Sequence, residues 1–186
     1  MDLAINIKKQ ESELITAVQQ RERWALKKIY EEHYDYLFPV CLRYAQSEPE
    51  AEDIMHEGFI KIYKNISKYE AGTSLKSWMR RIMVNSSIDH YRERKRKRTE
   101  EITPMLKMRS KRPDVFSKLT VDEILLALRK LSPTYRTVFN MFVIEGFSHR
   151  EIANALNITE STSRSNLVKA RNKLKSILLP KENYYE

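Results

Sequence analysis

The sequence predicts an all-α protein made of two small helical domains that a flexible linker joins. Apolar residues recur in three- and four-residue steps over most of the chain, which is the spacing of one helix face. Only three glycines occur among the 186 residues, and tight hairpins draw heavily on glycine. We divide the chain into an N-terminal extension (1–23), a first domain (24–98), a linker (99–119), a second domain (120–179) and a tail (180–186).

The first domain is predicted to begin with two helices. Apolar residues recur from Trp24 to Tyr44, and Pro39 inside this pattern is expected to kink or interrupt the helix. Ser47 is predicted to cap the second helix by accepting a hydrogen bond from a free amide of the first turn. Gly58 lies within that second helix, where glycine costs about 1 kcal/mol of stability relative to alanine.

A turn at residues 71–74 separates these helices from a third, which is predicted to run from Leu75 to beyond Arg92. Gly72 permits a backbone turn that other residues resist, and Ser74 can cap the helix that follows. Residues 99–119 then lose the helical pattern, which predicts the linker.

The second domain shows clear helix starts. Capping boxes are predicted at Thr120–Glu123 and Ser148–Glu151. The helix that starts at Ser132-Pro133 is predicted to bury apolar residues up to Val143. Thr159 is predicted to cap a long final helix that ends near Leu179.

Residues 148–174 combine a short helix, a turn of about four residues and a longer amphipathic helix, which is the layout of a helix-turn-helix. An α-helix fits the major groove of DNA, and residues near its start reach the base edges. Arg164 could bind guanine, and Asn166 could bind adenine or phosphate, whereas Lys169 and Arg171 suit phosphates. The alternative is a structural helical hairpin with a basic exterior. The residues that the second helix presents near its start are Thr162, Ser163, Arg164, Ser165, Asn166, Val168 and Lys169.

Charge is distributed unevenly along the chain. Residues 1–70 carry 10 basic and 13 acidic side chains, whereas residues 71–112 carry 13 basic and four acidic ones. This pattern favours one surface for a protein and another for a polyanion, although a solvated surface with chance clustering is the alternative. Trp78, His90 and Tyr91 beside arginines suit single-stranded nucleic acid. The spacing of Trp78 from Leu75 and Ile82 favours core packing for that residue.

The second predicted helix carries an acidic patch at Glu52, Asp53 and Glu57, beside side chains that are expected to be exposed at Met55, His56 and Ile60. Such an amphipathic surface suits a partner helix, although it can equally be a solvated face.

Several classes of function are excluded by what the sequence lacks. One cysteine, Cys41, excludes a disulfide scaffold and a multi-thiolate metal site. No nucleophile–base pair, phosphate-binding glycine loop or paired acid–base carboxylates occur, so we expect no catalytic residue, no metal and no cofactor. His33 and His149 are expected to be surface or packing residues. No apolar run approaches a membrane span and no secretory signal is visible, so we expect a soluble cytoplasmic protein without membrane insertion.

Two motif sets, in this order, resemble the extracytoplasmic-function (ECF) sigma factors of bacterial RNA polymerase over roughly residues 20–178. In the first domain the motifs are EAEDIMHEGFIKIY (50–63), LKSWMRRIMVN (75–85) and IDHYR (88–92). In the second domain they are LSPTYRTVF (131–139), GFSHREIA (146–153) and TSRSNLVKAR (162–171).

The resemblance implies that the protein binds core RNA polymerase and directs it to promoters by recognising two DNA elements. The polymerase contact, on the coiled coil of the β′ clamp, would involve Asp53, Met55, His56, Glu57 and Ile60. The minus-ten element, with a base of the non-template strand captured by the turn and Asn85, would involve Gly72, Thr73, Ser74, Lys76, Trp78, Arg81, Asn85 and Arg92. The minus-thirty-five element would be read in duplex DNA by Thr162, Arg164, Ser165, Asn166, Val168 and Lys169, with Arg171 on the backbone.

The same resemblance implies the partners of the chain. These are the β′ clamp and β subunits of core RNA polymerase and promoter DNA in duplex and single-stranded form. An anti-sigma factor is a further candidate partner. Opening of the promoter would need no ATP site if binding energy alone drives it. The alternative function is a stand-alone helix-turn-helix regulator that binds duplex operators without polymerase.

Overall fold

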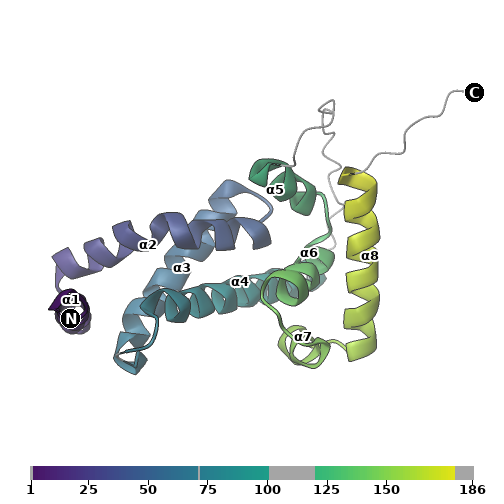
Figure 1. The fold of residues 1–186 in the computed structure, drawn as a ribbon. Helices are drawn as coiled ribbons and strands as arrows, with labels where there is room; N and C mark the ends of the chain where they lie inside the picture. The colour runs from purple at the N-terminus through teal and green to yellow at the C-terminus, as the bar shows by residue number, and fades with distance from the viewer. Residues whose placement is uncertain (1, 71, 101–119, 179–186) are drawn as a thin grey trace, which may run out of the picture. The chain divides into compact units, whose positions relative to one another are not determined.

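The computed structural model describes residues 2–70, 72–100 and 120–178, and these residues form helices and short connections without a strand (Figure 1). The all-α prediction is therefore confirmed. Contacts divide the chain into two compact units, Met1–Ser87 and Ile88–Glu186. Of the predicted linker (99–119), residues 99 and 100 are the end of a helix, and the remainder lies outside the described residues, as does the predicted tail (180–186). The domain boundaries at those points therefore stay predictions.

In the first unit, α2 (Arg23–Tyr44) and α3 (Glu48–Asn65) pack against each other. The Tyr63 hydroxyl donates to the Leu26 carbonyl at 2.9 Å, and the rings of Tyr30 and Phe59 lie 4.7 Å apart. Partners late in α3 thus lie beside residues early in α2, which makes the two helices antiparallel.

Two details of α2 differ from the sequence prediction. The helix continues through Pro39 without a break, so the predicted interruption is wrong, whereas the alternative of a kink stays a prediction. Leu37, Val40 and Cys41 are buried on either side of Pro39 in the chain, so tertiary packing holds the helix together across the proline. Trp24 is 54% exposed rather than part of the buried face.

The N-terminal extension contains a helix, α1 (Asp2–Gln19), that the sequence analysis did not predict. Its described part buries Leu14, Ala17 and Val18. It contacts α2 and the short 3-10 helix η1 (Ile66–Lys68), so it is a packed part of the first unit.

Close helix packing explains Gly58, which the sequence shows only as an unfavourable residue in a helix. A Cβ atom built on Gly58 would lie 2.4 Å from the sulfur of Met83 in α4 (Leu75–Glu100). Met83 is fully buried. The missing side chain therefore lets α3 and α4 approach, and this gain offsets the weaker helix propensity of glycine.

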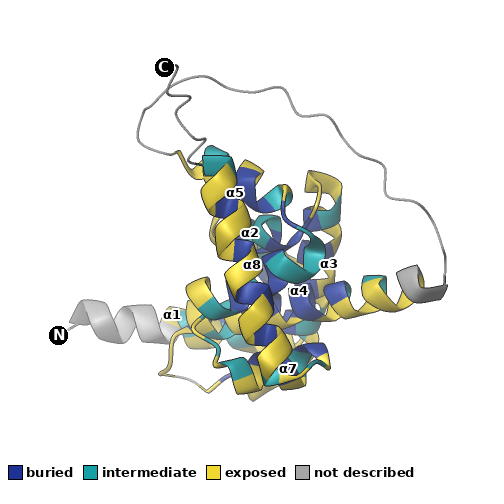
Figure 2. Cartoon of the chain, turned by 90° about the vertical axis from the view of Figure 1, so that its right-hand side faces the viewer, coloured by how far each residue is buried: buried dark blue, intermediate teal, exposed yellow. Residues whose placement is uncertain are grey.

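The second unit contains α5 (Val121–Arg129), α6 (Pro133–Phe139), α7 (His149–Leu156) and α8 (Glu160–Leu178). Both predicted capping boxes are present. Figure 2 shows buried and exposed residues interleaved along these helices, as expected of helices with one apolar side. One buried cluster joins α5 and α8, and it consists of Ala127, Leu128, Leu131, Ala170 and Leu174, with Tyr135, Phe139, Ile177 and Leu178 packed on it.

A π-helical segment, η2 (Asn140–Ile144), follows α6 directly. The Glu145 amide donates to the Asn140 carbonyl at 3.0 Å, five residues back instead of four. This wider turn changes the phase of the apolar pattern. Val143 is 47% exposed as a result, so its predicted burial is wrong.

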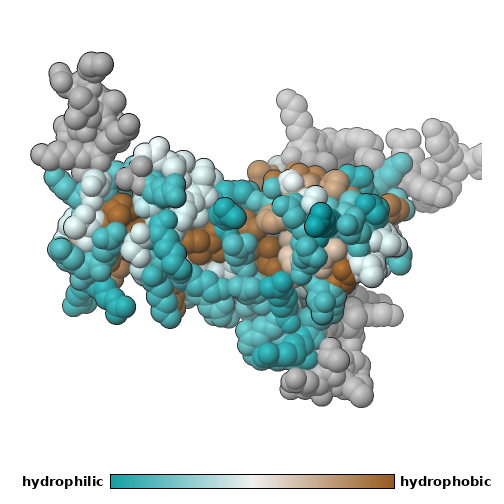
Figure 3. All heavy atoms as spheres, turned by 90° about the horizontal axis from the view of Figure 1, so that it is seen from below, coloured by the Kyte–Doolittle hydropathy of each residue, from teal (hydrophilic) through white to brown (hydrophobic). Residues whose placement is uncertain are grey.

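The surface seen in Figure 3 is largely hydrophilic, and its hydrophobic atoms lie in separate patches. Among the described helices, none has an apolar stretch long enough to cross a bilayer.

We predict that the effect of Gly58→Ala depends on Met83. In the wild-type background the new methyl group clashes with Met83, and overpacking should lower the free energy of unfolding by about 1 kcal/mol net of the gain in helix propensity. In a Met83→Ala background the space is free, so the same change should raise that free energy by about 1 kcal/mol. Urea unfolding of the four variants measures this coupling, and equal effects in both backgrounds would contradict it.

Candidate nucleic-acid interface

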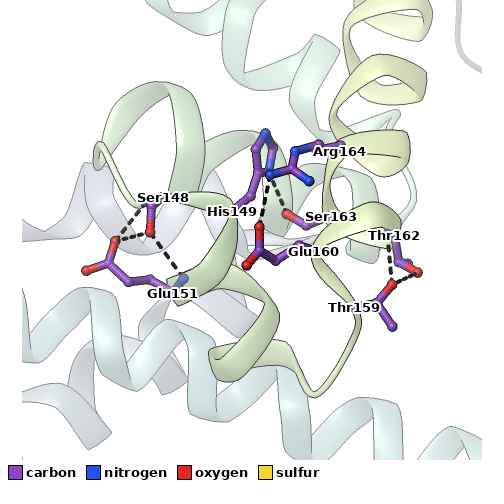
Figure 4. Close-up of polar contacts among 8 residues, drawn as sticks. All are labelled: Ser148, His149, Glu151, Thr159, Glu160, Thr162, Ser163 and Arg164. Carbon is purple, nitrogen blue, oxygen red and sulfur yellow. Dashed lines mark hydrogen bonds and ion pairs between the residues drawn. The ribbon is translucent and has the colours of Figure 1, made fainter.

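The outer side of α8 carries the predicted duplex-reading residues. Thr159 caps the helix, since its hydroxyl accepts from the Thr162 amide at 3.1 Å (Figure 4). Six of the seven predicted residues lie on exposed positions of one helix, and Val168 among them is 56% exposed. The exposed six are Thr162, Arg164, Ser165, Val168, Lys169 and Arg171.

Asn166 is the exception: its predicted position on the outer face is wrong, whereas its contact with an adenine base or a phosphate stays a prediction. Its side chain is only 8% exposed and lies on the buried side of α8 with Ser163, Leu167 and Ala170. The reason is helical phase, because positions 163, 166, 167 and 170 follow the three- and four-residue steps of one face. Ser163, which was predicted to be presented near the start of the helix, is fully buried by the same rule.

Arg164 is held by a weak partner in the free protein. Its guanidinium lies 2.9 Å from the Glu160 carboxylate, and the two side chains are 60% and 44% exposed (Figure 4). An exposed pair of this kind contributes about 0–1 kcal/mol. A DNA base or phosphate can therefore replace Glu160 at small cost, which leaves Arg164 available for recognition.

His149 fixes the two helices of the helix-turn-helix relative to each other, which confirms its expected packing role. Its Nδ1 atom lies 2.9 Å from the Ser163 hydroxyl (Figure 4), and its ring stacks on Phe142 with centroids 4.4 Å apart. Asn157 completes the turn in the left-handed region at φ 51°. Desolvation and the nearby charges of Arg164 and Arg171 lower the pKa of His149, and this outweighs the opposite effect of Glu160.

The turn before α4 is ordered by hydrogen bonds among its own residues. The Glu70 carbonyl accepts from the Thr73 amide at 3.2 Å and from the Thr73 hydroxyl at 2.8 Å. Gly72 adopts φ +95°, which side-chain-bearing residues rarely adopt. Ser74 caps α4 by accepting from the Ser77 amide at 3.2 Å. Gly72, Thr73 and Ser74 are all exposed, so their polar groups are accessible to a ligand.

The predicted contact residues of α4 divide between two sides of the helix. Arg81, Asn85 and Arg92 are exposed and lie on one side of the helix. The spacings between them, four and seven residues, are close to one and two turns of an α-helix. Arg92 is paired with Asp89 at 3.5 Å on the surface. Lys76 falls on a different side, where its ammonium lies 4.8 Å above the ring of Tyr36.

Trp78 is half-buried, and its ring centroid lies 5.7 Å from that of Tyr69. This contact agrees with the packing role that its spacing favours. Tyr69 is not among the residues predicted from the sequence, but its hydroxyl donates toward the Thr73 carbonyl at 2.6 Å. The only feature of the sequence that could have pointed to Tyr69 is its position, as an aromatic residue just before the turn.

Four of the five residues that were predicted to contact the polymerase lie at exposed positions of α3. Asp53, His56, Glu57 and Ile60 are exposed, and Ile60 is half exposed at 50%. Met55 is fully buried, with its sulfur 3.9 Å from that of Cys41, so its predicted exposure is wrong. Position 55 lies about 200° around the helix from position 53, on the side that packs inward.

Within the described ranges, no group of three or more histidine, cysteine, aspartate or glutamate side chains is arranged to hold a metal ion.

We predict that His149 makes the stability of the second unit depend on pH. Since its pKa is lowered in the folded state, the unfolded chain binds a proton more readily below about pH 6.5. The free energy of unfolding should therefore fall as the pH drops from 7.5 towards 5. His149→Gln can still bond Ser163 but does not titrate in this range, so it should flatten the dependence. Urea unfolding across this range provides the measurement, and an unchanged slope in the variant would contradict the prediction.

Two segments of the chain match models of known protein families. Residues 29–97 match "Sigma-70 region 2", and residues 122–174 match "Sigma-70, region 4". The chain is similar in fold to the sigma factor RpoE of Bartonella quintana, solved in complex with the anti-sigma factor NepR. The TM-score is 0.51 at 22% identity, over 83% of this chain and 98% of that one.

Curated relatives agree with these matches. The chain is 30% identical over 129 residues to the RNA polymerase sigma factor SigZ of Bacillus subtilis, over 68% of this chain and 72% of the relative. It is 28% identical to the ECF sigma factor SigW of that bacterium, over 88% of this chain and 94% of the relative. It is 29% identical to the ECF sigma factor SigE of Mycolicibacterium smegmatis, over 79% of this chain but only 59% of that relative's length. The chain belongs to the ECF family of RNA polymerase sigma factors.

Proposed function

We propose that this chain binds core RNA polymerase and selects promoters through two separate DNA contacts. Its first unit would dock on the polymerase and hold unpaired bases of the minus-ten element, and its second unit would read the minus-thirty-five element as duplex. The observation that carries the proposal is the presence in one chain of both matched segments, residues 29–97 and 122–174, each with its own exposed polar face.

The exposed face of α3 fits a protein partner. It combines the carboxylates of Asp53 and Glu57 with the exposed side chain of Ile60. Apolar contact supplies affinity, while the carboxylates set orientation and partner choice. The coiled coil of the β′ clamp is the partner that we assign to this face. Met55 is buried beneath the face and contributes to it only by packing against the core. An anti-sigma factor that covers such faces is a further expected partner, because RpoE is solved with NepR.

Base capture requires an accessible, ordered turn beside positive charge. The turn at 72–74 is exposed and internally bonded, and Arg81, Asn85 and Arg92 share one side of the helix that follows. A base that leaves the duplex loses pairing and stacking, and contacts in a protein site must replace that energy. We assign the turn and Asn85 to the base, and the arginines to the phosphates.

Duplex recognition by α8 requires side chains that reach into the major groove. Arg164 can present two donors to guanine, and the apolar side chain of Val168 can contact a thymine methyl group. Lys169 and Arg171 are exposed farther along the helix, where phosphate contacts fix the register.

A stand-alone regulator of duplex operators is the competing function. The two functions differ in whether the chain forms a stable complex with polymerase. Co-purification of the chain with core enzyme detects such a complex. Reconstituted transcription is the stronger experiment. Core polymerase without any other specificity subunit should initiate at defined sites on a genomic template pool when this chain is added. Operator binding without such initiation would reject the proposal and favour the regulator.

We predict that Asn85→Ala impairs promoter opening more than duplex binding. A captured base contributes about 1–3 kcal/mol, so affinity for the single-stranded non-template segment should fall about tenfold or more. Permanganate reactivity of unpaired thymines measures opening, and fluorescence anisotropy measures binding. Asn154→Ala, at an exposed position of α7, is the matched control and should behave as wild type. Equal opening by Asn85→Ala and wild type would remove Asn85 from the mechanism.

Arg164→Ala should relax sequence preference in the upstream element. Loss of a bidentate contact removes about 1–3 kcal/mol of discrimination at one base pair. Arg171→Ala is the comparison, because loss of a phosphate contact weakens binding to all sequences alike and lowers the salt dependence by about one unit. Binding to a set of single-base variants of a mapped promoter distinguishes the two patterns. The same uniform weakening in both variants would contradict the assignment of Arg164 to a base.

A further inference from the structure

We propose that Tyr69 and Glu11 are positioning residues for the base-capturing turn, so that helix α1 helps to set how firmly the turn is held. This inference rests on the function proposed for residues 72–74. It assigns a role to a helix that precedes the matched segment, which begins at residue 29.

Tyr69 connects the turn to the body of the first unit. Its side chain is only 8% exposed, and its ring packs near Trp78 at 5.7 Å between centroids. Its hydroxyl lies 2.6 Å from the Thr73 carbonyl oxygen. Since the ring is fixed by packing, a hydrogen bond from its hydroxyl fixes the backbone of Thr73, which follows the left-handed Gly72.

A second acceptor competes for the same hydroxyl. The Glu11 carboxylate oxygen also lies 2.6 Å from the Tyr69 oxygen. A phenol has one proton and can donate to only one acceptor at a time. Desolvation and the bond to Glu11 raise the pKa of Tyr69, so the hydroxyl keeps its proton. The hydroxyl proton of Tyr69 therefore points either towards Glu11 in α1 or towards the Thr73 carbonyl in the turn.

The two directions have different consequences for the turn. When Tyr69 donates to Thr73, the carbonyl of the turn is held in addition to the two bonds that Thr73 makes to Glu70. When Tyr69 donates to Glu11, the Thr73 carbonyl loses that partner, and the turn keeps only its local bonds. A charged hydrogen bond is stronger than a neutral one, so ionised Glu11 draws the proton away from the turn.

Packing keeps Glu11 in this position. Leu14, Ala17 and Val18 are buried where α1 contacts α2 and η1. Glu11 lies one turn before Leu14, at an intermediate exposure, so the anchored helix presents its carboxylate to Tyr69.

The test uses the full chain in complex with core polymerase, and a labelled single-stranded DNA oligonucleotide from the non-template strand of a mapped promoter. Tyr69→Phe keeps the ring and removes the donor. Glu11→Gln keeps the shape and offers an amide that donates to the Tyr69 oxygen, which leaves the hydroxyl proton to Thr73. The matched controls are Tyr63→Phe, whose hydroxyl bonds the Leu26 carbonyl at 2.9 Å, and Glu13→Gln, at an exposed position of α1.

Tyr69→Phe should weaken oligonucleotide binding about three- to tenfold, the effect of one lost hydrogen bond. Glu11→Gln should strengthen it about threefold, and this gain should vanish when Tyr69 is also changed to Phe. Both controls should bind the oligonucleotide as wild type does. Binding to core polymerase and to upstream duplex should be unchanged in all variants, which separates positioning from a general loss of structure.

The result that overturns the inference is wild-type oligonucleotide affinity in Tyr69→Phe while Asn85→Ala loses affinity. Equal weakening by Tyr69→Phe and Tyr63→Phe would also overturn it, since the effect would then be one of stability. If Asn85→Ala binds as wild type too, the proposed function of the turn fails and the inference fails with it.

Discussion

Burial of one apolar side on each of α3, α4 and α8 is the constraint on which the rest of the structure depends. Each helix that carries proposed contact residues is fixed by its inner side, so only its outer side is available to a partner. Gly58 shows how tightly this holds in the first unit, because a Cβ atom at this position would require the buried end of Met83 to shift. In the second unit Ala170 and Leu174 hold α8 in the same way. A surface whose backbone is fixed by packing loses little further freedom when a partner binds, which keeps the cost of ordering low.

Local patterns in the sequence predicted most of the helices and the chemistry of their ends. Capping residues such as Thr120 and Ser148 form the expected bonds, because a cap depends only on residues three positions apart. The wrong predictions of side-chain exposure come from the position of a residue around the helix axis. Met55 and Asn166 lie inside correctly predicted helices, but each sits one step away from the outer face. Residue type decided those two assignments, whereas the structure decides them by the direction of the side chain.

Other features depend on contacts that sequence spacing cannot show. Glu11 and Tyr69 are 58 positions apart, so no local pattern connects them. The π-helical segment at Asn140–Ile144 changes the phase of the helix without a proline or glycine to signal it. The clash that keeps residue 58 a glycine likewise comes from Met83 in a different helix. Tertiary packing determined each of these features, and single-sequence propensity carries little information about it.

Electrostatics links the free protein to its proposed complexes. Exposed pairs such as Arg164–Glu160 and Lys97–Glu93 hold basic side chains at the surface in the absence of DNA. These pairs are weak and screened by salt, whereas phosphate binding releases condensed counterions. Exchange of a carboxylate for a phosphate therefore favours the complex, most of all at low ionic strength.

Site-specific photocrosslinking tests the central claim most directly, namely that the two units hold different forms of DNA at the same time. A crosslinker placed at Arg81 in α4 and, separately, at Val168 in α8 would be activated in a polymerase–promoter complex. We expect the probe at 81 to label only the non-template strand within the melted segment, and the probe at 168 to label upstream duplex on the same promoter. Crosslinks from both positions to one duplex segment, in complexes that have not melted, would contradict the account.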